Sequence, residues 1–66
     1  MSKRHSQKEK EILARKIKEY REKNNLTQEE LADMIKVSVF SISRWERAKH
    51  YPPASTLKLM KMLGVL

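Results

Sequence analysis

The spacing of apolar residues predicts an all-helical chain. Along the first third of the sequence, apolar side chains recur at intervals of four and three residues and form one stripe: Leu13, Ile17 and Tyr20. Ser6, with Glu9 three residues later, has the pattern of a capping box that begins this helix, which runs to about Lys23. Asn24-Asn25 predicts its end, because asparagine tolerates the left-handed backbone conformation.

Two shorter predicted helices follow in close succession. Thr27 and Glu30 form a second capping-box pattern, which begins a helix over residues 28–35. After a turn of only two residues, Ser38 caps a third helix that runs to about Arg47. The apolar positions of these helices are spaced for burial on one side: Leu31, Ala32, Ile35, Ile42 and Trp45.

The last part of the chain predicts a loop and a fourth helix. Two prolines at the end of residues 48–53 keep this segment out of a helix. Ser55 is the expected cap of a helix that ends at about Leu63, before Gly64. The positions of this helix that we expect to be buried are Met60 and Leu63, with either Leu57 or Leu59.

The length and composition indicate one small domain. We expect residues 6–66 to fold and residues 1–5 to form a basic arm. The sequence has no cysteine, so no disulfide or zinc–thiolate site supports the core. No apolar run approaches the roughly 20 residues of a membrane-spanning helix. Because residues 1–23 are charged throughout, we expect no signal peptide and a cytoplasmic protein.

The charge of the chain is strongly positive and unevenly distributed. Fifteen Lys and Arg against eight Asp and Glu give a net charge of +7. Residues 1–23 carry +5, residues 24–46 carry −2 and residues 47–66 carry +4. Such a chain favours polyanions, because binding releases counterions from phosphates. Charge alone also fits a surface kept soluble by repulsion, an anionic membrane surface or an acidic protein partner.

The middle of the chain resembles a known family. The stretch LTQEELADMIKVSVFSISRWERAKHYPP is similar to the lambda-repressor/Cro-type (XRE) helix-turn-helix domain, and the resemblance covers residues 16–65. Four groups of positions carry the resemblance: Thr27-Gln28, Leu31-Ala32, Val37-Ser38 and Ile42 to Glu46. A basic loop and Pro52 follow them. The resemblance implies a compact all-α, four-helix, lambda-repressor-like DNA-binding domain whose helix-turn-helix unit spans residues 28–47. The small Ala32 fits this unit, because its two helix backbones approach closely.

The sequence departs from the family pattern at two turns. Lys36 and Ala48 stand where the family usually has glycine. If Lys36 is left-handed, it costs about 1 kcal/mol relative to glycine. Many relatives also continue into a fifth helix that dimerises, so a five-helix domain is the alternative architecture. The resemblance implies a homodimer on DNA, and we expect that dimer to be weak or absent free in solution.

The resemblance implies that the helix over residues 38–47 enters the major groove with its first residues against base edges. Helical spacing places four candidate base-reading residues on the face opposite the apolar stripe: Val39, Phe40, Ser43 and Arg44. Phe40 suits contact with thymine methyl groups, and a minor core position is the alternative. Arg44 suits guanine O6 and N7, and a phosphate contact or a solvent-facing charge is the alternative. Ser43 suits either a base or a phosphate.

The same resemblance implies phosphate contacts on both sides of this helix. Gln28 matches a residue that holds a phosphate in the family, and the helix N-terminus beside it favours an anion. Ser38 is both a cap and a candidate phosphate contact. Three more candidates lie in the loop where relatives bind the DNA backbone: Lys49, His50 and Tyr51. Lys3 and Arg4 are expected either to reach along the groove as an arm or to form a disordered basic tail.

Arg21 and Glu46 occupy the positions of a partly buried Arg–Glu bridge in the family. The resemblance implies that this bridge ties the first helix to the end of the third and fixes the angle of the reading helix. Trp45, beside Glu46, is expected in the core.

We therefore expect a sequence-specific double-stranded DNA-binding transcriptional regulator, a repressor rather than an activator, on a palindromic operator. The alternative is the antitoxin half of a toxin–antitoxin pair, which binds a toxin protein and its own operator. We expect no cofactor, metal or small-molecule ligand. An enzyme is disfavoured, because the chain has no Gly-rich phosphate loop, no cysteine, no metal-ligand spacing and no Ser/His/Asp spacing suited to a pocket. A membrane-active helix is disfavoured, because the apolar stripe of the first helix is narrow and lacks Trp and Phe.

Overall fold

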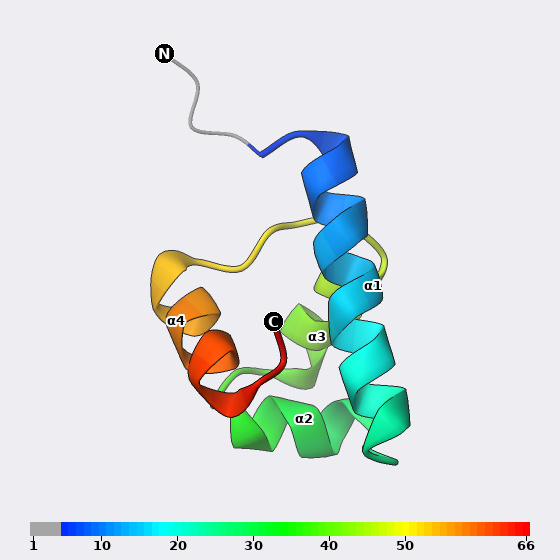
Figure 1. Ribbon diagram of the computed structural model, residues 1–66, viewed down its shortest axis with the longest axis vertical. Coiled ribbons are helices and arrows are strands. Elements are labelled where there is room, and N and C mark those ends of the chain that lie inside the picture. The colour runs from blue at the N-terminus through cyan, green and yellow to red at the C-terminus, as the bar shows by residue number, and fades with distance from the viewer. Residues whose placement is uncertain (1–4) are drawn as a thin grey trace.

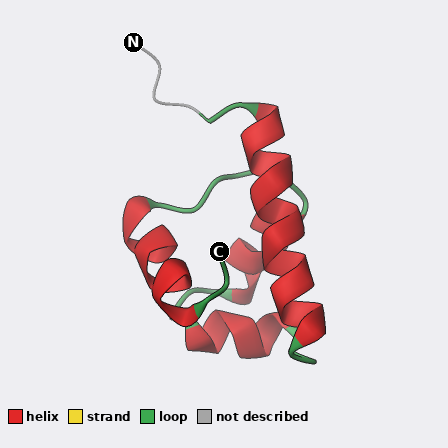
Figure 2. Ribbon diagram, viewed as in Figure 1, coloured by secondary structure: helices red, strands yellow, loops and turns green. Residues whose placement is uncertain are grey.

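The computed structural model describes residues 5–66, which form helices joined by short loops (Figure 1). The helices are α1 (Gln7–Lys23), α2 (Gln28–Met34), α3 (Val39–Glu46) and α4 (Ala54–Leu63). Residues 5–66 contain no strand (Figure 2), so the predicted all-α architecture with four helices is confirmed. Within the same range, no helix combines the length and apolar character that crossing a membrane requires. Lys3 and Arg4 of the predicted arm lie outside the described residues.

Side-chain caps begin the first three helices as predicted. The Ser6 hydroxyl accepts a hydrogen bond from the Glu9 backbone N–H at 3.1 Å, and the Glu9 carboxylate accepts one from the Ser6 N–H at 2.8 Å. Thr27 makes the same reciprocal pair at the start of α2, at 3.0 and 2.8 Å. At the start of α3, Ser38 accepts from the Ser41 N–H at 3.1 Å. These bonds satisfy donors that a helix leaves unpaired, so local sequence sets the three starting points.

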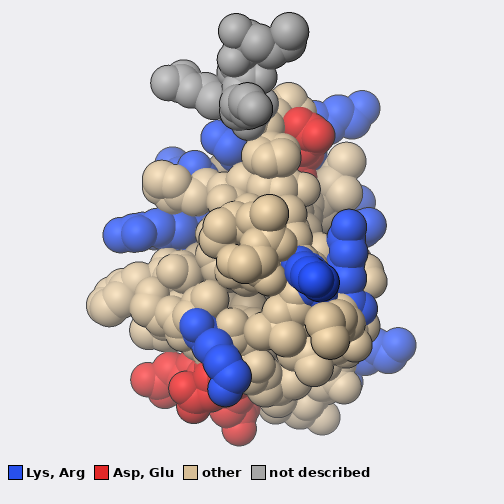
Figure 3. Space-filling view, turned by 90° about the vertical axis from the view of Figure 1, so that its left-hand side faces the viewer, with Lys and Arg blue, Asp and Glu red and all other residues tan. Residues whose placement is uncertain are grey.

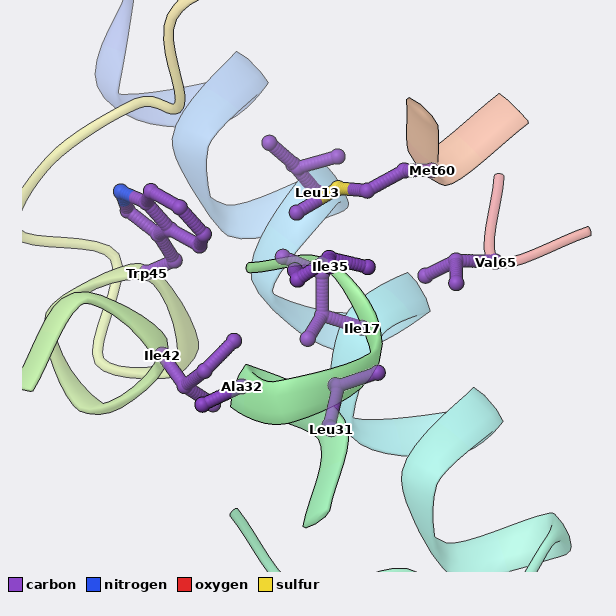
Figure 4. Close-up of a cluster of buried hydrophobic side chains, with 9 residues drawn as sticks. All are labelled: Leu13, Ile17, Leu31, Ala32, Ile35, Ile42, Trp45, Met60 and Val65. Atoms are coloured by element: carbon purple, nitrogen blue, oxygen red, sulfur yellow. The ribbon is translucent and has the colours of Figure 1, made fainter. Parts of the chain in front are cut away.

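The core is centred on α3, which packs directly against both α1 and α2. Its inward side chains, Ile42 and Trp45, join a buried cluster from the other elements (Figure 4): Leu13, Ile17, Leu31, Ala32, Ile35, Met60 and Val65. Ala32 is buried in this cluster, where its small side chain fits the close approach of α2 and α3. The apolar stripes that the sequence predicts for the first three helices therefore face one another.

The fourth helix begins and packs differently from the prediction. It begins at Ala54, after Pro53, and no side chain caps it, so the prediction that Ser55 is the cap was wrong. Pro53 has extended backbone, and a proline at a helix start leaves no unpaired N–H of its own. Leu63 is 40% exposed, so the prediction that it is buried was also wrong, whereas Val65 is 5% exposed and lies in the core.

Gly64 explains why Val65 and not Leu63 enters the core. Gly64 ends α4 with φ 86, a left-handed conformation that glycine adopts without a steric penalty. The chain then reverses, and the Val65 N–H donates to the Met60 carbonyl at 2.9 Å. The reversal carries Val65 back to the cluster around Met60, while Leu63 stays at the surface. The predicted helix stop at Gly64 is confirmed.

Three non-glycine residues in the described chain adopt left-handed backbone just after helices: Asn25, Lys36 and Ala48, with φ of 55, 59 and 58. At the turn between α2 and α3, the Val37 N–H donates to the Ala32 carbonyl at 3.0 Å, directly after Lys36. This hydrogen bond closes a tight turn, so only a short segment connects the two helices. Lys36 therefore adopts the conformation for which glycine is the less strained residue.

Replacing Lys36 with glycine is expected to raise the free energy of unfolding by roughly 0.5–1 kcal/mol, because glycine adopts this conformation without strain. Lys18→Gly is the matched control. Lys18 is exposed within α1, where glycine is expected to lower the free energy of unfolding by about 1 kcal/mol. Urea unfolding measures both variants. A similar loss of stability in both would contradict the strain at Lys36.

Candidate DNA-binding surface

The outward face of α3 carries the residues that the sequence suggests for reading bases. Phe40 is 70% exposed, so the alternative that it is a minor core residue is wrong. Arg44, one helical turn later, is also exposed, and Ser43 is half-buried. Val39 is half-buried and packs against the core, so less of its side chain faces outward than its spacing suggests. The exposed face of α3 is therefore formed mainly by Phe40 and Arg44.

The Glu46 carboxylate at the end of α3 forms the predicted ion pair with Arg21 of α1. Arg21 Nε donates to Glu46 Oε2 at 2.7 Å and Nη2 donates to Oε1 at 3.1 Å, a two-pronged geometry. The Glu46 side chain is 6% exposed and that of Arg21 is 18% exposed. The hydrogen bond to Glu46 raises the pKa of Arg21 above its ordinary value. Arg21 Nη1 also donates to the Leu26 carbonyl at 3.1 Å, which joins the loop before α2 to the pair.

Gln28, the predicted phosphate contact at the start of α2, belongs to the same network. Its Nε2 donates to Glu46 Oε1 at 3.1 Å. An amide nitrogen carries two hydrogens, so the other hydrogen is available for a second acceptor. The sequence does not predict this bond, because the two residues are 18 positions apart and their spacing gives no sign that they are neighbours.

The loop between α3 and α4 holds the other predicted phosphate contacts. Lys49 and His50 are exposed, and Tyr51 is half-buried. The Tyr51 ring stacks on the His5 ring, with centroids 3.5 Å apart and 18° between the ring planes. Gln7 Nε2 donates to a backbone carbonyl of the same loop at 3.2 Å. The structure therefore brings the start of α1 to this loop, a contact that the sequence did not predict.

Charge is distributed unevenly over the surface. Lys and Arg are scattered over the face that α4 presents, whereas most of the acidic side chains seen on this face lie at its lower end, near α2 (Figure 3). The acidic side chains of α2 are Glu29, Glu30 and Asp33. Ser38, the remaining predicted phosphate contact, is exposed at the start of α3. A polyanion is therefore attracted near the basic side chains and repelled at the acidic side of α2.

A model of the helix-turn-helix family matches residues 17–64, which include all of α2, α3 and α4. The chain belongs to the lambda-repressor/Cro-type helix-turn-helix family. This family consists of DNA-binding regulatory domains rather than enzymes. The resemblance read from the sequence is therefore confirmed, and α2, the turn and α3 are the two helices and the turn that give the family its name.

One relative of this helix-turn-helix domain is named "HTH-type transcriptional activator BcrR", from Enterococcus faecalis. It is 46% identical over 43 residues, which cover 65% of this chain and 21% of the relative. The chain therefore spans about a fifth of the length of this relative. No solved structure matches the chain.

Arg21→Ala and Glu46→Ala are each expected to lower the free energy of unfolding by roughly 2–4 kcal/mol, between the values for exposed and fully buried pairs. Each variant leaves a half-buried or buried charge without its partner. The double variant is expected to lose less than the sum of the two. Denaturant unfolding of all four proteins measures the coupling. Strict additivity would mean that the ion pair does not stabilise the fold.

Proposed function

We propose that this domain is a sequence-specific double-stranded DNA-binding transcriptional regulator, which reads the major groove with α3 and its caps, residues 38–47. The observation that carries the proposal is the exposed face of α3 on a helix whose other face is fixed in the core. Phe40 and Arg44 project from the exposed face, and Ile42 and Trp45 anchor the opposite one. A helix held in this way presents its side chains to base edges without first having to order itself.

Base reading is assigned to α3. Phe40 offers a large apolar surface to thymine methyl groups, and the Arg44 guanidinium matches the two acceptors of guanine, O6 and N7. Ser43 adds a hydroxyl that donates to or accepts from either kind of base pair. Val39 contributes the part of its side chain that the core leaves uncovered. The supporting evidence is that the two residues with the most specific chemistry, Phe40 and Arg44, are also exposed.

Phosphate binding is assigned to residues that flank α3: Gln28, Ser38, Lys49, His50 and Tyr51, together with Lys3 and Arg4 of the arm. Glu46 supports the role of Gln28, because it holds one amide hydrogen and leaves the other for a phosphate oxygen. Lys49 and His50 are exposed on the loop that follows α3. Contacts of this kind position the protein on the duplex and carry no base information.

Repression is the regulatory outcome that we propose. Occupation of an operator excludes other proteins from the same DNA and needs only the DNA-binding surface. Activation requires, in addition, a surface that recruits another protein. The chain covers 21% of the relative named as an activator, so that name is not carried over to this chain.

We further propose that two copies bind a palindromic operator, with half-sites centred about 34 Å apart. Two exposed apolar side chains at the end of α4 support this proposal: Met62, 74% exposed, and Leu63, 40% exposed. A second copy related by two-fold symmetry covers the same side chains on both partners. Because the apolar area is small, the contact favours a dimer that forms on DNA rather than in solution.

Substitutions on α3 are expected to change specificity, whereas substitutions beside it change general affinity. Phe40→Ala and Arg44→Ala should each cost about 1–3 kcal/mol on the preferred site and little on random DNA, because base contacts are lost. Gln28→Ala and Lys49→Ala should weaken every duplex alike, because phosphate contacts are lost. Titrations on specific and scrambled duplexes, with the preferred site taken from selection in a random library, measure both effects.

The salt dependence of the same titrations provides the control. For the unchanged protein, the logarithm of the association constant should fall steeply with the logarithm of salt concentration, by about 0.9 for each phosphate neutralised. Lys49→Ala should make this slope shallower, and Phe40→Ala should leave it unchanged. A flat slope for the unchanged protein would contradict the phosphate contacts and count heavily against DNA as the partner. Equal weakening of both duplexes by Arg44→Ala would make Arg44 a phosphate contact.

Two copies are expected to bind a palindrome cooperatively, and Met62→Glu is expected to weaken the second binding step, because it places a charge in the proposed contact between copies. Met62 is exposed, so this variant should still fold. Ser55→Glu, which adds the same charge at another exposed position of α4, is the matched control. Gel shifts on palindromic and half-site duplexes measure the stoichiometry. Full affinity of one copy for an isolated half-site would contradict the dimer.

A further inference from the structure

The loop between α3 and α4, residues 48–53, is anchored by backbone hydrogen bonds at its two ends, and at the second end the Pro53 carbonyl accepts from the Leu57 N–H at 3.0 Å. Its first two residues donate to carbonyls in the last turn of α3, at 3.1 and 2.9 Å. Neither His50 nor Tyr51 donates its backbone N–H to another backbone group within residues 5–66. The middle of the loop is therefore held through the Tyr51 side chain, which also packs against the core, whereas His50 is exposed.

Two side chains at the start of α1 reach this loop from a distant part of the sequence. The His5 ring stacks on Tyr51 at 3.5 Å, and Gln7 Nε2 donates to the Ala48 carbonyl at 3.2 Å. His5 lies directly before the Ser6 cap, whose reciprocal hydrogen bonds fix the backbone at the start of α1. The imidazole also lies 3.8 Å from a Glu9 carboxylate oxygen. The ring that meets Tyr51 is therefore carried by an ordered helix end.

We propose that His5, Gln7 and Tyr51 form a clasp that holds the loop in its phosphate-binding position, with His5 as a positioning residue for DNA binding. This proposal rests on the function proposed above. Lys49 and His50 lie between the two anchored points, at Ala48 and Tyr51. A segment fixed at Ala48 and Tyr51 has fewer conformations to lose when it binds a phosphate, so His5 and Gln7 increase affinity without touching DNA.

The contact itself is tested by unfolding, without DNA. His5→Ala, Tyr51→Ala and the double variant form a double-mutant cycle. If the rings stack, the double variant should lose less stability than the sum of the single losses. Ser55→Ala, a neutral change at an exposed position, should show no coupling with Tyr51→Ala. Additive losses at His5 and Tyr51 would overturn the clasp whatever the protein binds.

The role of the clasp is tested by DNA titration at temperatures where every variant is fully folded. His5→Ala and Tyr51→Ala should each weaken binding about two- to tenfold, the range expected from one aromatic pair. The double variant should be no weaker than the weaker single variant. Both single variants should also show a shallower salt dependence, because the loop then holds its phosphate contacts less well. A loss of fold stability alone would not change that slope.

A conservative variant separates positioning from direct contact. His5→Phe keeps an aromatic ring and removes the nitrogens, and it should bind DNA within about twofold of the unchanged protein. If it binds as weakly as His5→Ala, the nitrogens of His5 contact DNA themselves and the clasp is overturned as a positioning device. If the unchanged protein binds no duplex, the proposed function fails, while the unfolding cycle still decides whether the stack exists.

Discussion

The Glu46 carboxylate is the group on which the orientation of α3 depends. It is 6% exposed, and a buried charge without partners costs several kcal/mol. It accepts hydrogen bonds from Arg21 of α1 and from Gln28 of α2. One carboxylate at the end of α3 therefore joins three helices, and the direction in which Phe40 and Arg44 point follows from this junction and from the packing of Trp45 beside it.

The turns before and after α3 both contain strained backbone. Lys36 and Ala48 both adopt left-handed backbone directly after a helix, although each carries a side chain. The strain is modest compared with the burial of the α3 side chains, for which about 1.5–3 kcal/mol each is typical. A straighter and less strained turn at Lys36 would move α3 away from Ala32 and open the core.

The exposed face of α3 and the loop that follows it are held in place in different ways. The exposed face of α3 is rigid because its opposite face is packed, and this suits the discrimination of bases. The loop after α3 leaves Lys49 and His50 exposed, and it is held by backbone hydrogen bonds to α3, by Tyr51 against the core and by side chains at the start of α1. Side chains at the start of α1 therefore meet the loop that follows α3, on the side of this helix where we propose phosphate contacts.

The sequence alone was sufficient to predict the helices and three of their caps. Ser6, Thr27 and Ser38 act through bonds to residues three positions away, so the chain that contains the cap also contains its partner. It also located the α2–turn–α3 unit and, through the family pattern, the pair Arg21 and Glu46. The roles of the DNA-contacting residues remain proposals, because which base or phosphate a side chain meets depends on the docked duplex.

Only the tertiary structure decided which side chains far apart in the chain contact each other. Gln28 meets Glu46, and His5 meets Tyr51, although no periodicity links them. Val65 replaces Leu63 in the core because the reversal at Gly64 changes which side chain faces inward, and helical spacing describes only the residues before that reversal. Local rules operate within one helical turn, whereas these contacts arise only when packing has brought separate segments to the same place.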